Sequence, residues 1–223
     1  IDKVQQIQVN LKKNITFANG LRSIVRQDPD VIMVGEIRDN ETASIAVNAS
    51  MTGHLLFSTL HANDAATIFP RLLEMGIEPF LVASSINVVI AQRLVRKICP
   101  HCKINYPKTA ADIPDIVALE KDVKFKNMMK KFFPGKDLKD IKLYRGIGCK
   151  TCKHTGYLGR TAVFEVMEVT DDIRALISTK TSSSLIENKA EEGDMTLMYY
   201  NGLVHLFNGI TTYDELESLS NID

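Results

Sequence analysis

The sequence has no net charge, because its 27 Lys and Arg residues balance its 27 Asp and Glu residues. Such a balance gives no electrostatic reason to expect a nucleic acid as a partner. No stretch approaches the roughly 18 consecutive apolar residues of a membrane-spanning helix, so we expect no transmembrane segment. Residues 1–4 show neither the basic start nor the apolar run of a signal peptide, and they include no initiator Met. We therefore expect a cytoplasmic protein that is a fragment or a processed product of a longer chain.

Cysteine is scarce, and all of it falls in two CxxC pairs. In a chain without export signals, this pattern favours a metal over disulfides. A CxxC turn lets two thiolates reach one tetrahedral ion, and a second turn closes the site to substrates. We expect one structural zinc ion (Zn²⁺) held by Cys99, Cys102, Cys149 and Cys152. Two redox pairs or four free thiols are the alternative, and His101 or His154 could replace a thiolate ligand.

The phosphate-binding loop GxxxxGK[ST], known as Walker A, is also absent. The segment 156–161 resembles it only superficially, with the wrong spacing and no lysine. The sequence therefore contains no cradle for the β- and γ-phosphates of a nucleotide. We expect the chain by itself to bind ATP weakly or not at all.

Apolar residues in the N-terminal part alternate between helical and strand spacing. The pattern predicts a strand within residues 3–10, helices at 17–26, 40–50, 64–75 and 80–90, and strands at 31–34, 55–57 and 94–98. Asn40 is expected to cap the second helix, and Pro70 to bend or shorten the third. The strand at 31–34 is expected to be buried and parallel. This alternation implies an α/β sheet layer.

The character of the sequence changes at Cys99. Residues 103–148 are rich in lysine, lack a strong apolar period and contain three prolines: Pro107, Pro114 and Pro134. We expect a small appendage there. A strand is predicted at 162–169, and the remainder is expected to be helical. One helical face carries three apolar residues: Leu203, Leu206 and Phe207.

The apolar run at 31–34 is followed by Gly35 and the acid Glu36, an arrangement typical of a Walker B strand. Such a strand delivers its carboxylate to the C-terminal edge of the sheet, where phosphates bind in open α/β folds. There Glu36 could hold Mg²⁺ or orient the attacking water. Acids often follow apolar strands, so a solvated strand end is the alternative.

Three arginines and a histidine accompany this acid. Arg22 and Arg26 lie four residues apart on one helical face, and Arg38 follows Glu36 by two residues. Three guanidinium groups near one carboxylate would neutralise phosphate charge, whereas a salt-bridged surface is the alternative. His61 follows the next predicted strand. Its imidazole could sense a γ-phosphate or be merely structural.

Taken in order, several motifs resemble those of the bacterial type II secretion and type IV pilus assembly ATPases. They are FANGLR through QDPD at 17–30, GEIRD at 35–39, TGH at 52–54, STLH at 58–61, QRLVR at 92–96, both CxxC pairs, GRT at 159–161, MTL at 195–197 and GIT at 209–211. The resemblance covers nearly the whole chain except the lysine-rich insert.

The resemblance implies an α/β fold with three parts. These are a partial RecA-like ATPase core without its P-loop, a small tetracysteine zinc subdomain and a C-terminal helical bundle, at residues 1–98, 99–160 and 161–223. It implies that Glu36 is the Walker B glutamate and that His61 belongs to a histidine box. Arg22, Arg26 and Arg38 would support hydrolysis or contact a neighbouring subunit. As in the family, Gly35 stands where most Walker B strands carry aspartate.

By the same resemblance, the longer parent protein would be a homo-hexamer that binds ATP and Mg²⁺ and hydrolyses ATP at the cytoplasmic face of the inner membrane. It would drive pilus or pseudopilus assembly, or type II secretion, through an inner-membrane platform protein. The four cysteines favour the assembly branch. The fragment alone is expected to be inactive, because Walker A is absent. The alternative function is a non-catalytic zinc-containing interaction module that docks such a platform protein.

Overall fold

The computed structural model describes residues 4–106 and 116–220. The start of the strand predicted within 3–10 lies outside this range, as do Pro107 and Pro114 of the lysine-rich insert. Among the described residues, no helix is both long enough and apolar enough to cross a membrane.

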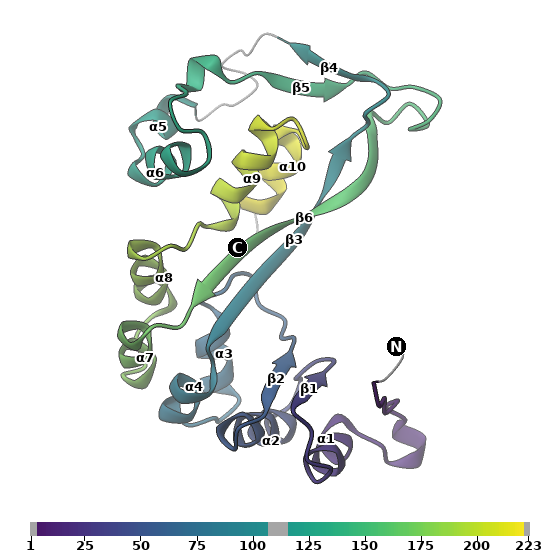
Figure 1. Ribbon diagram of the computed structural model, residues 1–223, viewed down its shortest axis with the longest axis vertical. Coiled ribbons are helices and arrows are strands. Elements are labelled where there is room, and N and C mark those ends of the chain that lie inside the picture. Colours follow the sequence, from purple (N-terminus) through teal and green to yellow (C-terminus); the bar gives the residue numbers. More distant parts are fainter. Residues whose placement is uncertain (1–3, 107–115, 221–223) are drawn as a thin grey trace. The chain divides into compact units, whose positions relative to one another are not determined.

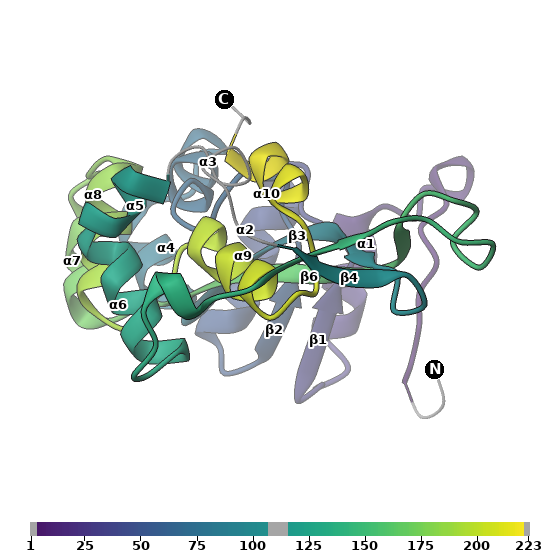
Figure 2. The ribbon, with the colours of Figure 1, turned by 90° about the horizontal axis from the view of Figure 1, so that it is seen from above.

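The chain forms two compact units, each assembled from two segments (Figure 1, Figure 2). Unit 1 comprises residues 1–89 and 167–193, and unit 2 comprises residues 90–166 and 194–223. The three domains expected from the sequence stay a prediction, because the two units are defined by compactness alone.

Unit 1 alternates helices and strands, as the apolar pattern predicts. Its elements are the 3-10 helix η1 (Leu11–Lys13), α1 (Phe17–Val25), β1 (Val31–Val34), α2 (Asn40–Met51), β2 (Leu55–Ser58), α3 (Ile68–Glu74), α4 (Pro79–Ser85), α7 (Asp171–Ser178) and α8 (Ser183–Glu192). Residues 4–10 contain only a bridge from Asn10 to Ile15. The strand predicted there is therefore wrong over its described part, because no described strand runs beside it to pair with.

Strands β1 and β2 pair in parallel, with Val31 opposite Leu55 and Met33 opposite Phe57. The prediction of a parallel strand at 31–34 is confirmed, but it is buried on one face only. Ile32 and Val34 are buried against helices, whereas the opposite face exposes more than half of each of four side chains: Val31, Met33, Leu55 and Phe57. This two-stranded sheet therefore has one covered face and one open apolar face.

The start of α2 is fixed by an aspartate. The Asp39 carboxylate accepts the Thr42 N–H at 2.8 Å, so Asp39 is the N-cap. The expected cap, Asn40, is therefore wrong by one residue, and its side-chain amide donates instead to the Met75 carbonyl. An aspartate suits this place because its charge also meets the positive end of the helix dipole.

Two predicted helices are shorter than expected. Helix α3 begins at Ile68, so that Pro70 lies in the first turn, where its missing N–H costs nothing. The helix predicted at 80–90 ends at Ser85, and β3 (Val88–Ile98) follows it. The β-branched run at 88–90 explains this difference, because such side chains favour the extended backbone.

Unit 2 is organised by β3 and β6 (Tyr157–Glu168), which pair with each other and run in opposite directions (Figure 1). The strands predicted at 94–98 and 162–169 are confirmed within these longer strands, although β6 ends at Glu168, one residue before the predicted end. Among the described residues every sheet has two strands, and β3 does not join β1 and β2. The single sheet layer expected from the alternation is therefore not completed within this chain.

The described residues of the lysine-rich insert form regular secondary structure. The insert forms β4 (Lys103–Tyr106), α5 (Ile116–Lys121), α6 (Val123–Phe132), the 3-10 helix η2 (Leu138–Asp140) and β5 (Leu143–Gly146). Its apolar residues share one core with α9 (Met198–Phe207) and α10 (Tyr213–Ser220). The Phe125 ring meets the Phe207 ring edge-on at 6.2 Å. The expectation that the insert lacks a strong apolar period is wrong. Its core positions are separated by lysines, so the apolar spacing is not evident in the sequence.

Leu143 tests this shared core, since its side chain is fully buried there. We expect Leu143→Ala to lower the free energy of unfolding of unit 2 by about 2–5 kcal/mol, as removal of a buried leucine usually does. Urea unfolding with amide hydrogen exchange in β5 and α9 measures the change. Val123→Ala is the control, because Val123 is 68% exposed. If amide exchange becomes faster in β5 while the amides of α9 stay fully protected, the shared core is contradicted.

Candidate functional site

The parallel pairing of β1 and β2 brings the carboxyl ends of both strands to the same edge. Gly35 and Glu36 follow β1, and Thr59 and His61 follow β2. The Thr59 hydroxyl donates to the Gly35 carbonyl at 2.7 Å, and the Ile37 N–H donates to the Thr59 carbonyl at 3.0 Å. These two bonds lock the loops together and fix the backbone on both sides of Glu36.

Glu36 is the centre of a small charged cluster. Its Oε2 atom lies 2.6 Å from Arg38 Nε and 3.6 Å from His61 Nε2. The Glu36 side chain is 23% exposed, whereas those of Arg38 and His61 are 67% and 82% exposed. The structure thus brings together three residues that the sequence singles out. The Glu36 carboxylate is partly shielded from solvent, whereas the side chains of Arg38 and His61 are largely exposed.

The other two arginines lie apart from this carboxylate. Arg22 Nη2 is 2.6 Å from Glu41 Oε1 in the first turn of α2. Arg26 follows the last residue of α1, and among the described residues no carboxylate forms an ion pair with it. Only Arg38 contacts Glu36, so the expected gathering of three guanidinium groups does not occur within the described chain. Sequence reasoning missed Glu41, because a contact across 19 residues leaves no local pattern.

The four cysteines of unit 2 form a compact cluster. Their Sγ atoms all lie within 4.8 Å of one another, and the group contains neither histidine. The Sγ separations are 3.9 Å for Cys99–Cys149, 3.9 Å for Cys102–Cys152 and 3.7 Å for Cys149–Cys152. A disulfide would hold its sulfurs about 2.05 Å apart. A tetrahedral ion with bonds of about 2.3 Å would hold four thiolates about 3.8 Å apart, which the cluster matches.

Tight turns position these thiols. Lys153 and His154 have φ values of 52° and 63°, and the His154 N–H donates to the Cys149 carbonyl at 2.8 Å. Beside this turn, two glycines cross at close range. A Cβ atom on Gly146 would lie 2.1 Å from the carbonyl oxygen of Gly156, so only glycine fits at position 146.

The surroundings affect the thiols unequally. Burial raises the pKa of Cys102 to about 12. Burial also opposes ionisation of Cys152, but the N–H groups of Cys149 and Gly156 donate to its sulfur and lower the pKa of Cys152 to about 6. Because metals bind the thiolate form, loading of this cluster would release protons. The cluster is a candidate metal centre with no place for a substrate among its ligands.

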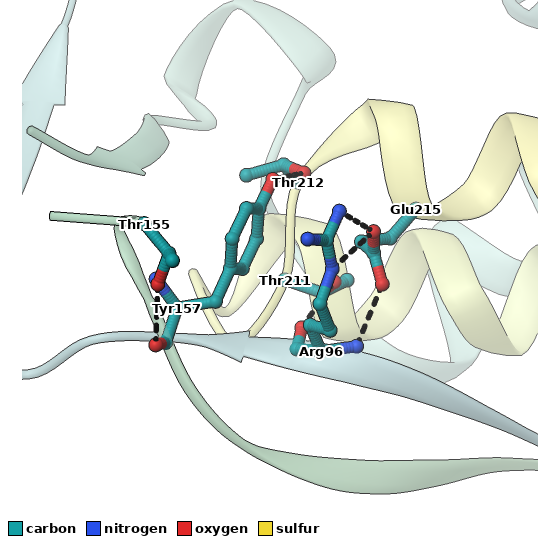
Figure 3. A network of polar contacts seen from close by, with 6 residues as sticks. All are labelled: Arg96, Thr155, Tyr157, Thr211, Thr212 and Glu215. Carbon is teal, nitrogen blue, oxygen red and sulfur yellow. Dashed lines mark hydrogen bonds and ion pairs between the residues drawn. The ribbon is translucent and has the colours of Figure 1, made fainter. Parts of the chain in front are cut away.

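A polar network follows the second CxxC turn, and Figure 3 shows it from Thr155 onward. The Thr155 hydroxyl donates to the Cys152 carbonyl at 2.7 Å, and the Tyr157 N–H donates to the Thr155 hydroxyl at 3.3 Å. The Tyr157 hydroxyl lies 2.8 Å from Thr212 Oγ1, just before α10. The cysteine cluster is therefore connected through this network to the beginning of the last helix.

Arg96 completes this network from β3. Its guanidinium lies 4.2 Å from the centre of the Tyr157 ring and donates to Glu215 Oε1 through Nε and Nη2 at 2.9 and 2.7 Å (Figure 3). Burial raises the pKa of Glu215, but the hydrogen bonds from Arg96 outweigh this effect and lower it. The ion pair fastens α10 to the strand that leads into the first CxxC turn.

A family model and the similar proteins of known name all point to the same family. The family described as "Type II/IV secretion system protein" matches residues 1–218. The chain is 44% identical to the "Type II secretion system ATPase E" of Vibrio cholerae over 97% of its own length and 39% of that protein. It is 41% identical to the "Type IV pilus assembly ATPase PilB" of Thermus thermophilus, over 97% of this chain and 23% of that protein. The chain thus spans less than half of these curated relatives.

The fold has a counterpart among solved structures. The ATPase DotB of Legionella pneumophila superposes with a TM-score of 0.60 at 19% identity, covering 98% of this chain and 47% of that one. At this identity the likeness shows the fold alone. The chain therefore has the α/β fold of an ATPase of known structure.

The cysteine geometry predicts one tightly bound metal ion per chain. Metal analysis of protein purified without added metal should find it, and Cys152→Ser should abolish it and lower the thermal stability of unit 2, because a structural metal contributes folding free energy directly. His101→Ala should keep the metal, since His101 is exposed and outside the cluster. Disulfides in place of metal would contradict this interpretation.

Proposed function

The chain belongs to the type II/IV secretion system protein family, and from this membership we propose that it is the C-terminal part of the motor domain of an ATPase. The longer protein hydrolyses ATP to drive pilus or pseudopilus assembly, or type II secretion. The observation that carries the proposal is the position of Glu36. It lies at the carboxyl edge of two parallel strands, against Arg38 and near His61.

The open face of β1 and β2 supports a partial RecA-like core. Parallel sheets are normally covered on both faces, yet Val31 and Met33 with their partners on β2 leave one apolar face open. In the longer protein, further strands and helices of the core extend this sheet and cover that face. The helices proposed for the C-terminal bundle pair within their own units, α7 with α8 in unit 1 and α9 with α10 in unit 2.

ATP and Mg²⁺ would bind in the longer protein, because this chain has no phosphate-binding loop. Bound MgATP supplies the phosphoryl group that is transferred to water. Glu36 either accepts a proton from the attacking water or holds the metal, and both roles suit a carboxylate at a sheet edge. Arg38 and His61 lie within reach of the same point and are suited to contact phosphate oxygens.

We propose zinc as the ion of the cysteine cluster. Four thiolates are soft ligands that select zinc over the hard cations, and the tetrahedral spacing suits it. Because all four positions are protein ligands, the ion is structural. It fixes the turns at both ends of the insert, and thereby the end of β3 and the beginning of β6.

The working assembly is proposed to be a homo-hexamer on the cytoplasmic face of the inner membrane, acting on an inner-membrane platform protein. Arg22 and Arg26 then gain a role that the isolated chain does not show. Arg22 is about half exposed, and its partner Glu41 lies at the surface of the same unit. Both arginines are available to reach a neighbouring subunit across a shared nucleotide site.

Glu36→Gln in the full-length protein tests the catalytic assignment. The substitution preserves size and hydrogen bonding but removes the negative charge. ATP turnover should fall about 10²- to 10⁴-fold while ATP binding survives, because general-base assistance is worth about that much. Glu74→Gln, the same change at an exposed position of α3, is the control. Joint loss of binding and turnover would assign Glu36 to magnesium, and unchanged turnover would reduce it to a solvated strand end.

Subunit mixing tests the arginines. If Arg22 and Arg26 form only exposed ion pairs, each Ala substitution should cost about 0–1 kcal/mol of stability and little activity. If Arg22 acts across a subunit boundary, Arg22→Ala should reduce turnover by up to about 10³- to 10⁵-fold with the fold intact. Mixed hexamers of Arg22→Ala and Glu36→Gln subunits should then regain hydrolysis, because one interface holds both intact groups. If hexamers that are shown to be mixed regain no ATP hydrolysis, Arg22 acts in the nucleotide site of its own subunit.

A further inference from the structure

The segment at 209–215 connects α9 to α10 and lies against the end of β3. The Ile98 N–H donates to the Ile210 carbonyl at 2.8 Å, and the hydroxyl of the fully buried Thr211 donates to the Arg96 carbonyl at 2.9 Å. Ile98 is the last residue before the first CxxC pair. The backbone that enters the first CxxC turn is therefore held by a segment that follows it by 115 residues.

Glu215, in the first turn of α10, contacts the same part of β3 (Figure 3). Its Oε2 atom accepts the Arg96 backbone N–H at 2.7 Å, and its Oε1 atom accepts Arg96 Nε and Nη2 at 2.9 and 2.7 Å. The Glu215 side chain is only 14% exposed. Both carboxylate oxygens are thus occupied by one residue of β3. A glutamine has an oxygen on one side only, so it cannot accept bonds on both sides.

The same segment also contacts the strand that follows the second CxxC turn. Tyr157 begins β6, and its hydroxyl lies 2.8 Å from Thr212 Oγ1. Its ring lies 4.2 Å from the guanidinium carbon of Arg96. Thr155 lies between this tyrosine and the turn, because its hydroxyl donates to the Cys152 carbonyl and accepts the Tyr157 N–H. The residues that flank both CxxC turns are therefore attached to one short segment.

The start of the segment approaches the insert so closely that a side chain does not fit. Gly209 has a φ of 66°, and a Cβ atom there would lie 2.5 Å from the Tyr144 ring and 2.7 Å from Lys103 Nζ. Lys103 begins β4 and Tyr144 belongs to β5, the two strands by which the insert leaves and rejoins the cysteines. The segment 209–215 thus contacts each of the four strands that flank the cysteine cluster.

We propose that Arg96, Tyr157 and Glu215 are positioning residues of the cysteine cluster, and that metal binding and the docking of α10 on β3 stabilise each other. The proposal rests on the metal assignment above. A tetrahedral ion requires four sulfurs at fixed spacing, and the flanking strands determine where the sulfurs lie. A bound ion in turn fixes those strands, onto which α10 docks. Residues outside the ligand set commonly change metal affinity by about 10- to 100-fold.

Zinc affinity of the whole chain tests this coupling. Glu215→Gln should weaken zinc binding, measured by competition with a chelating dye, at least about fivefold, the lower end of typical coupling between sites. Tyr200→Phe is the matched control. It removes a hydrogen bond from Tyr200 to Asp122, which joins α9 to the start of α6 in the same unit. Its zinc affinity should equal that of the unsubstituted chain. Equal weakening in both variants would show general loosening of unit 2 and overturn the proposal.

Amide hydrogen exchange measures the reciprocal effect. Removal of zinc under reducing conditions should speed exchange in α10 by at least the factor by which Glu215→Gln weakens zinc binding, because coupling between two equilibria is mutual. The amides of α7 and α8 in unit 1 are the internal reference and should not change. Unchanged zinc affinity in Glu215→Gln, whatever the exchange of α10, would leave Glu215 as an anchor of that helix alone and overturn the coupling. A chain that binds no zinc would overturn the metal assignment, and the coupling with it.

Discussion

The pairing of β3 with β6 is the constraint on which unit 2 depends. It brings the first CxxC turn, at the end of β3, beside the second, before β6, and the Cys99 N–H donates to the Gly156 carbonyl at 2.8 Å. Closing the long loop between the two CxxC pairs costs conformational entropy, and this cost grows only slowly with loop length. The insert offsets part of this cost with its own core against α9 and α10. A metal at the cysteines would offset more, because its ligands are already gathered.

The pairing of β3 with β6 also explains how the last helix is linked to the cysteine cluster. Glu215 of α10 accepts hydrogen bonds from both the backbone and the side chain of Arg96, three residues before Cys99. Tyr157 lies between this ion pair and the second CxxC turn. Pairs of this kind contribute little when isolated at a surface, but here one carboxylate satisfies several donors in a fixed geometry. The C-terminal helix and the two CxxC turns are thus held by a common set of side chains.

Sequence reasoning succeeded where the signal was local. The parallel strands and the cluster of Glu36, Arg38 and His61 follow from apolar runs and from the rule that parallel strands end at one edge. Partners fixed only by tertiary packing were missed. Glu41 captures Arg22 from another helix, and the core of the insert is completed by α9, far along the chain. The strand predicted within 3–10 is wrong over its described residues 4–10, because an alternating pattern does not provide a neighbouring strand to pair with.

The contact between Glu36 and Arg38 constrains how the proposed site can work. With Arg38 Nε 2.6 Å from its carboxylate, Glu36 cannot bind magnesium through the same oxygen until the guanidinium moves. Arg38 is 67% exposed, so little packing holds it in place. A phosphate offers a guanidinium charge-assisted bonds as good as those of a carboxylate. Arrival of a nucleotide would therefore transfer Arg38 from Glu36 to phosphate and free the carboxylate at the moment when it is needed. In the proposed ATPase, the ion pair would hold the Glu36 carboxylate until a nucleotide takes Arg38 from it.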